Sequence, residues 1–121
     1  MSLPYTDNLT ALNAVTQTTT SSAYDFSKRQ QITLIVTCAG HSSGNGVFTV
    51  NASNDGTNYA SGIVVEDKST ATTTNRTYVT SKTLSANGSA ALSVPAGFRF
   101  YTVTCTWTTD GTYSAVFEAA G

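Results

Sequence analysis

Residues 46–59 read GVFTVNASNDGTNY, and this stretch decides the fold class. Its first half alternates two sets of side chains with a period of two, which is typical of a strand with one buried face. The two sets are Val47, Thr49 and Asn51, and Phe48, Val50 and Ala52. Asn54-Asp55-Gly56 then supplies a turn, because Asn and Asp tolerate a left-handed backbone and Gly accepts positive φ without a steric cost. A second copy, WTTDGTY, occupies residues 107–113, so the sequence predicts a chain built from β-hairpins.

The composition indicates a single domain over residues 1–121 that meets other proteins. The net charge is -1, and charged residues make up only 11% of the chain. This low charge argues against binding to nucleic acid or to an acidic membrane surface. About one residue in five is threonine, a β-branched type that suits a half-exposed pleated surface. Few charges also mean little desolvation cost at a protein interface.

Cys38 and Cys105 are the only cysteines. Cys38 follows Ile32, Leu34 and Val36 in one alternation and Cys105 follows Tyr101 and Val103 in another, so we expect both sets on the apolar, inward side of their strands. A bridge across the two sheets is one interpretation, as in immunoglobulin domains. Two reduced core thiols acting as small apolar side chains are the preferred one, since nothing in the sequence indicates export.

Residues 1–12 are polar and mixed, with a proline at position 4, and we expect them to form an N-terminal arm. They lack the basic region and continuous apolar run of a signal peptide. No window approaches the roughly 18 apolar residues that a membrane span needs.

The rest of the chain reads as about eight short strands at intervals near ten residues, without a convincing helix. We expect these strands at residues 14–22, 31–38, 46–52, 61–67, 76–84, 90–94, 98–107 and 113–119. Asn87-Gly88 is a strong two-residue turn signal between the fifth and sixth strands. The sequence therefore predicts an all-β protein, an antiparallel β-sandwich with jelly-roll or immunoglobulin-like connections.

No catalytic, metal or cofactor site is expected. His41 lies in a Gly/Ser loop without a nucleophile pattern, so a solvated turn residue is the preferred interpretation. One His and two Cys on separate segments do not make a zinc site, and the acidic residues lack calcium-loop spacing. One alternative rests on the aromatic residues, which could form a sugar-stacking platform or could pack in the core or an interface. The residues concerned are Tyr59, Tyr78, Trp107 and Tyr113.

Four segments together resemble the small β-sandwich structural proteins of tailed bacteriophages. They are VFTVNAS, the turn NDGTNY, PAGFRFYTVTCTW and the closing DGTYSAVF, and they span residues 46–117. The tryptophan that usually follows the first turn in that family is Tyr59 here.

The resemblance implies a non-enzymatic virion protein made in the host bacterial cytoplasm. Its implied role is a capsid decoration (cement) protein, or else a neck, fibre or tail component. The implied partner is the major capsid protein, with self-association as a dimer or trimer. A carbohydrate- or receptor-binding module of a phage fibre, tail or secreted protein is the alternative function. The residues expected at the interface are the apolar arm residues and one loop aromatic, namely Leu3, Tyr5, Leu9, Leu12 and Tyr59.

Overall fold

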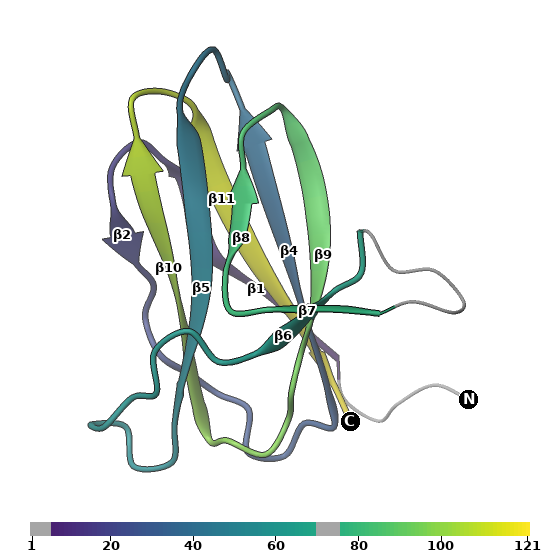
Figure 1. The fold of residues 1–121 in the computed structure, drawn as a ribbon. Helices are drawn as coiled ribbons and strands as arrows, with labels where there is room; N and C mark the ends of the chain where they lie inside the picture. The colour runs from purple at the N-terminus through teal and green to yellow at the C-terminus, as the bar shows by residue number, and fades with distance from the viewer. Residues whose placement is uncertain (1–5, 70–75) are drawn as a thin grey trace.

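The structure is a computed structural model that describes residues 6–69 and 76–121. In this part of the chain eleven strands form two antiparallel sheets that face each other, as Figure 1 shows. The strands are β1 Thr6–Val15, β2 Thr19–Thr20, β3 Tyr24–Asp25, β4 Gln31–Ala39, β5 Asn45–Ser53, β6 Val65–Asp67, β7 Thr77–Val79, β8 Lys82–Leu84, β9 Gly88–Val94, β10 Phe100–Thr108 and β11 Thr112–Ala120. The predicted β-sandwich is confirmed. None of the described residues forms a helix that could cross a membrane.

The larger sheet has the strand order β1-β11-β4-β9-β6-β7, and the smaller sheet has the order β2-β10-β5-β8, with β3 also paired to β10. The long strands β4, β5, β10 and β11 lie at or near the predicted positions. The predicted strand at residues 76–84 is instead two short strands, because β7 belongs to the larger sheet and β8 to the smaller one. The predicted strand at residues 61–67 is reduced to β6.

The prediction of hairpins is wrong for the turns at Asn87-Gly88 and Asp110-Gly111, whereas after the Asp55-Gly56 turn the chain pairs back on β5 through the short antiparallel bridge between Ala52 and Ala60 before it crosses to the larger sheet. Each of these turns leaves a strand of the smaller sheet and leads to a strand of the larger sheet, so the joined strands do not pair. The three connections are β5 to β6, β8 to β9, and β10 to β11. The turn residues reverse the chain as expected, but the reversal is an arch across the sandwich.

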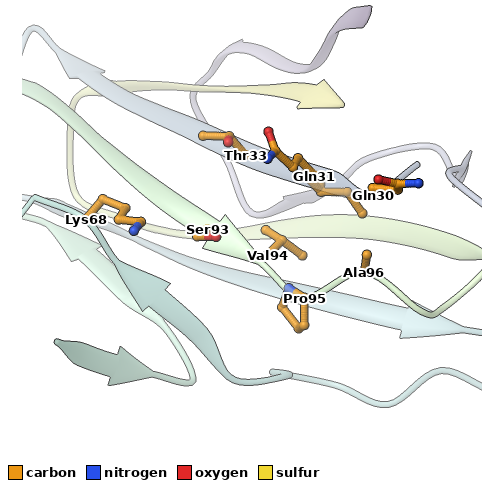
Figure 2. A pocket seen from close by; sticks show the side chains of 9 residues that line it. Gln30, Gln31, Thr33, Lys68, Ser93, Val94, Pro95 and Ala96 are labelled. Carbon is orange, nitrogen blue, oxygen red and sulfur yellow. The ribbon is translucent and has the colours of Figure 1, made fainter. Parts of the chain in front are cut away.

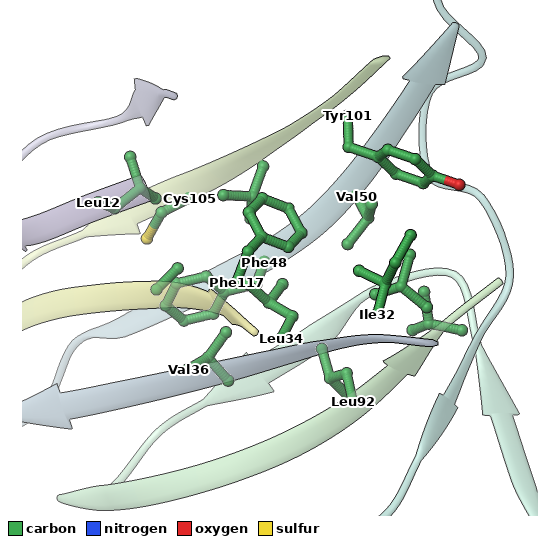
Figure 3. Close-up of a cluster of buried hydrophobic side chains, with 14 of the residues drawn as sticks. Leu12, Ile32, Leu34, Val36, Phe48, Val50, Leu92, Tyr101, Cys105 and Phe117 are labelled. Carbon is green, nitrogen blue, oxygen red and sulfur yellow. The ribbon is translucent and has the colours of Figure 1, made fainter. Parts of the chain in front are cut away.

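The core lies between the sheets and consists of the inward-facing residues of the alternating strands (Figure 3). On β4 the residues Leu34 and Val36 are completely buried, and on β10 the same holds for Tyr101 and Val103. Phe117 on β11 packs against Phe26 with ring centroids 5.4 Å apart. The predicted inward faces of both long strands are therefore confirmed.

Residues 6–12 do not form a separate arm. They belong to β1, which pairs with β11 along the edge of the larger sheet. Leu12 is only 2% exposed and belongs to the core, and Leu9 packs against that core. Leu12 is therefore closed off from a neighbouring molecule in this fold, whereas Leu9 remains partly exposed. Leu3 and Tyr5 lie outside the described residues.

Candidate binding surfaces

Among the described residues, the outer faces of the two sheets carry few charges, and those on the larger sheet are Glu118 on β11 and the ion-paired group of Glu66, Lys68 and Arg76 at β6. On the larger sheet, residues from four adjacent strands stand opposite one another in a row, which we call the apolar row. It consists of Thr10, Val116, Ile35 and Ala91. Serine and threonine flank this row, and Thr37 and Ser89 there share a hydroxyl hydrogen bond of 3.0 Å. Glu118 is the one acidic residue on the outer side of β11.

Charged side chains gather at strand ends and sheet edges, where they pair with one another. Asp7 at the start of β1 accepts from Arg29 at 2.8 Å, and Arg99 donates to Asp25 at 3.2 Å. The Nζ atom of Lys82 lies 2.8 Å from Asp67, whose side chain is only 5% exposed. Burial opposes ionisation of Asp67, but hydrogen bonds from Lys82 and Ser69 hold its pKa below the ordinary value.

The outer face of the smaller sheet contains a groove of about 490 Å³, which we call the threonine groove. Its floor comes from β5 and β10, one side comes from β2, and the other side comes from the segment that follows the Asp55-Gly56 turn. The lining residues are Thr20, Thr49, Asn51, Tyr59, Ser61, Thr102, Thr104 and Thr106. Seven of these eight side chains carry a hydroxyl, and none carries a charge.

A hydrogen-bond network holds the floor of the threonine groove. The amide of Asn51 donates to Thr102 Oγ1 at 3.1 Å and to Thr104 Oγ1 at 3.2 Å. Thr104 in turn shares a 2.9 Å hydrogen bond with Thr20. The backbone N–H of Gly62 points to Asn51 Oδ1 at 3.3 Å, which fixes the orientation of the amide because a backbone N–H can only donate.

At one end of the sandwich, three turns are joined by hydrogen bonds into a single assembly, which we call the turn cluster. Asp110 accepts from the backbone N–H groups of Ser42, Ser43 and Gly44 at 3.0 to 3.3 Å. These bonds hold the pKa of Asp110 at about 2. Asn87 Oδ1 accepts from the N–H of His41 at 2.8 Å, so the Asn-Gly turn joins the same cluster.

His41 and the two cysteines have structural roles in this arrangement. The Nε2 atom of His41 lies 2.6 Å from the carbonyl oxygen of Gly44, within its own loop. Cys38 and Cys105 are free and buried, and burial together with the nearby Cys38 raises the pKa of Cys105 to about 11. Within residues 6–69 and 76–121, no three His, Cys, Asp or Glu side chains are grouped so that they could hold a metal ion.

A second pocket of about 490 Å³ lies where β4 begins and β9 ends, and Figure 2 shows its lining side chains. Gln31, Thr33 and Ser93 supply uncharged polar groups, and Lys68 is its single cation. Lys68 is paired with Glu66 at 3.2 Å, a carboxylate that it shares with Arg76 at 3.6 Å. The pocket contains no aromatic side chain, so it offers neither a free charge nor a stacking surface to a ligand.

The aromatic residues do not form the platform considered above. Tyr113 is completely buried, and its ring packs near Phe48 with centroids 6.2 Å apart. The indole N–H of Trp107 donates to the carbonyl oxygen of Gly111 at 2.9 Å. Tyr78 is 60% exposed on the edge strand β7, beside the exposed Val64. Tyr59 alone lines the threonine groove, where it is partly buried.

The groove and the apolar row were not foreseen from the sequence. The alternation of strands β5 and β10 indicates which residues face outward. The groove also needs the register between these two strands, which places Thr49 opposite Thr104, 55 residues further along the chain. The sequence signal that could have pointed to the groove is the run TVTCTWT at residues 102–108, which places threonine at every second position.

Comparison with known proteins gives one informative similarity. No protein-family model matches the sequence, and no curated protein matches it significantly. The crystal structure of SPBc2 prophage-derived protein YomS is similar, with a TM-score of 0.71 and 13% sequence identity. The alignment covers 99% of this chain and 97% of that chain. At this identity the similarity establishes a shared fold over essentially the whole of both chains.

Proposed function

We propose that this chain is a non-enzymatic structural protein of a bacteriophage particle, namely a capsid decoration protein that binds the outer capsid surface and stabilises the head. The observation that carries the proposal is the distribution of charge. The outer surface over β1, β11, β4 and β9 and the outer face of the smaller sheet carry few charges, Glu118 being one. The ion pairs lie at sheet ends and edges and, for Glu66 with Lys68 and Arg76, on the outer side of β6. Protein interfaces are depleted of charge at their centre in the same way.

The larger sheet offers the better docking face, and we assign the contact with the major capsid protein to the apolar row. Ile35 and Val116 stand opposite each other in its middle, on strands that are paired on both sides. Both are partly exposed, whereas their neighbours along each strand are buried. A partner that covers this row desolvates few charges, since Glu118, the next outward residue of β11, is the one acidic side chain beside it.

Stabilisation then follows from mass action. A protein that binds the assembled capsid lattice but not the free capsid subunits stabilises the lattice by RT ln(1 + [L]/Kd) at each site, which is about 2.7 kcal/mol at 100 times Kd. Self-association as a dimer or trimer would place several copies around a symmetry axis of the lattice. Support for a phage origin comes from the fold that the chain shares with the prophage-derived protein YomS.

The test is binding to capsid shells that lack the protein, assembled from the major capsid protein of the same phage. We expect the purified chain to sediment with these shells and to raise their melting temperature. Ile35→Lys should weaken binding at least about tenfold, because it places an ammonium group in the middle of the contact.

Thr83→Lys is the matched control, since Thr83 is exposed on the edge strand β8 of the other sheet. Thermal denaturation of both variants checks that each is folded. Failure of the wild-type chain to bind any such shell would overturn the function. Equal binding by wild type and folded Ile35→Lys would overturn the choice of face.

A further inference from the structure

We propose that the threonine groove on the smaller sheet binds a neutral saccharide. The site lies on the face opposite the apolar row, so the proposal does not depend on capsid docking. It rests on the shape of the groove, on the uncharged polar groups that line it, and on the single aromatic ring at its side.

The groove is a shallow concavity, open to solvent, with a supported floor. A volume of about 490 Å³ falls within the range of small-molecule sites and gives room for a mono- or disaccharide. Asn51 and Thr102 are each only 9% exposed, and hydrogen bonds from Asn51 hold two threonine hydroxyls in place. Little side-chain freedom therefore remains to be lost when a ligand binds there.

The network also sets the direction of the hydroxyl groups. Asn51 donates to Thr102 Oγ1, which leaves the hydroxyl proton of Thr102 available to an acceptor in the groove. Thr104 also accepts a hydrogen bond from Asn51 and shares another with the hydroxyl of Thr20. That second bond uses only one of the two hydroxyl protons, so the other proton is available to a ligand. Thr102 Oγ1 accepts only from Asn51 and keeps a second lone pair, so the groove can both donate to and accept from a sugar hydroxyl.

The remaining features select among ligand classes. The lining contains no Lys, Arg, Asp or Glu, so it offers no charged partner to a phosphate, a carboxylate or an ammonium group. Its floor is polar, which disfavours a lipid or a wholly apolar ligand. Tyr59 supplies one flat ring with a hydroxyl at its edge, a side chain suited to a ligand with both an apolar face and polar groups.

The experiment is an NMR titration of the ¹⁵N-labelled full chain with glucose, galactose, mannose, N-acetylglucosamine and their common disaccharides. Glucose 6-phosphate and N-acetylneuraminic acid are the charged comparisons. We expect saturable shifts with at least one neutral sugar, confined to the backbone of residues 49–51, 59–61 and 102–106, and weaker binding of its charged analogue.

Variants separate the groove from the rest of the surface. Tyr59→Ala and Thr102→Val should each weaken binding about tenfold, while Tyr78→Ala, on an exposed ring at the edge of the other sheet, should leave it unchanged. Thr102→Val keeps the shape of the side chain and removes only the hydroxyl, and the melting temperature checks each fold. No saturable shift with any neutral sugar, stronger binding of the charged sugars, or wild-type affinity in folded Tyr59→Ala would each overturn the proposal.

Discussion

Two Asp-Gly turns have nearly the same sequence but different partners. Asp55 accepts hydrogen bonds from the N–H groups of Thr57 and Asn58, so its contacts stay within its own turn. Asp110 accepts from the loop at residues 42–44, more than 60 residues away in the chain. The same motif therefore completes a local loop beside the threonine groove in one place and joins distant turns in the other.

The tyrosine that follows each turn differs in the same way. Tyr59 is partly buried at the side of the groove, whereas Tyr113 is fully buried and donates its hydroxyl to the carbonyl oxygen of Asp110 at 3.1 Å. A Cβ atom on Gly46 would lie 2.5 Å from the Tyr113 ring, so that ring packs directly on the backbone of β5. The difference teaches that a turn motif fixes local backbone geometry, while its surroundings decide whether it supports the core or a surface.

The largest effect should come from removing the two tyrosine rings. Tyr113→Ala should lower the free energy of unfolding by about 4 kcal/mol, because it leaves a large cavity in the core. Tyr59→Ala should lower it by only about 1 kcal/mol, since that ring lies at the surface and is only partly buried. Urea denaturation measures both, and equal losses would contradict the distinction between the two turns.

Glycine substitutions probe the space around each turn and should have the next largest effect. A Cβ on Gly44 would meet backbone atoms of residues 108 and 110 at 2.2 to 2.7 Å, and backbone cannot move aside cheaply. We expect Gly44→Ala to cost about 3 kcal/mol. Gly56 has a φ of +78° and its Cβ would lie 3.3 Å from the Phe100 ring, so Gly56→Ala should cost about 1 kcal/mol. If chemical denaturation showed a larger loss of stability for Gly56→Ala than for Gly44→Ala, the expected order of the two turns would be wrong.

Removing the carboxylate of Asp110 or of Asp55 should have a smaller effect on stability. The two effects should differ, because only Asp110 bonds to a distant part of the chain. Asp110→Ala should lower the melting temperature by several degrees, because it leaves three backbone N–H groups of the turn cluster without their acceptor. Asp55→Ala should change the melting temperature less but increase amide hydrogen exchange at residues 57–58. If Asp55→Ala proved more destabilising than Asp110→Ala in calorimetry, this would contradict the interpretation that Asp55 stabilises only its own turn.

The smallest effect should be the pH dependence of the stabilisation that Asp110 provides. Its pKa of about 2 in the fold lies below the value near 4 of an unfolded aspartate. The ionised carboxylate therefore contributes its full stabilisation above about pH 4 and loses it as the pH falls towards 2. The difference in melting temperature between wild type and Asp110→Asn should shrink over this interval, and a constant difference would contradict the assignment.

Asp55 gives the matched control for that titration. Hydrogen bonds from Asn58 and Thr57 also hold its pKa well below the ordinary value. These contacts span only a few residues, so the unfolded chain can form them in part and its own aspartate pKa is lowered too. We therefore expect Asp55→Asn to alter the pH dependence less than Asp110→Asn.

Much of the fold could be predicted from the sequence, because strict alternation marks a strand with one buried face. The segment at residues 31–38 was placed within one residue of β4, and Leu34 and Val36 were placed in the core. The pairing of strands cannot be predicted, because the residues of a short turn show that the chain reverses but do not determine which sheet the next strand joins. The segment at residues 76–84 shows the same limit, since it changes sheets between β7 and β8.

The candidate surfaces were less accessible to sequence reasoning. Leu12 in a mixed polar segment was expected in an arm, but edge pairing of β1 with β11 carries it into the core. The sequence indicates Tyr59 as an interface residue only because it is a loop aromatic, and the structure adds that it lines the threonine groove. The threonines of the groove are individually ordinary, and only the register of β10 with β5 and β2 brings Thr104, Thr49 and Thr20 together.

The position of β11 has a consequence for how the protein is made. This strand comes last in the chain, yet it lies between β1 and β4 in the finished sheet. Residues 6–15 therefore have no strand to pair with until residues 112–120 have been synthesised. Such distant pairing makes folding slow, on the order of milliseconds to seconds, and leaves an apolar strand edge open to neighbouring nascent chains in the meantime.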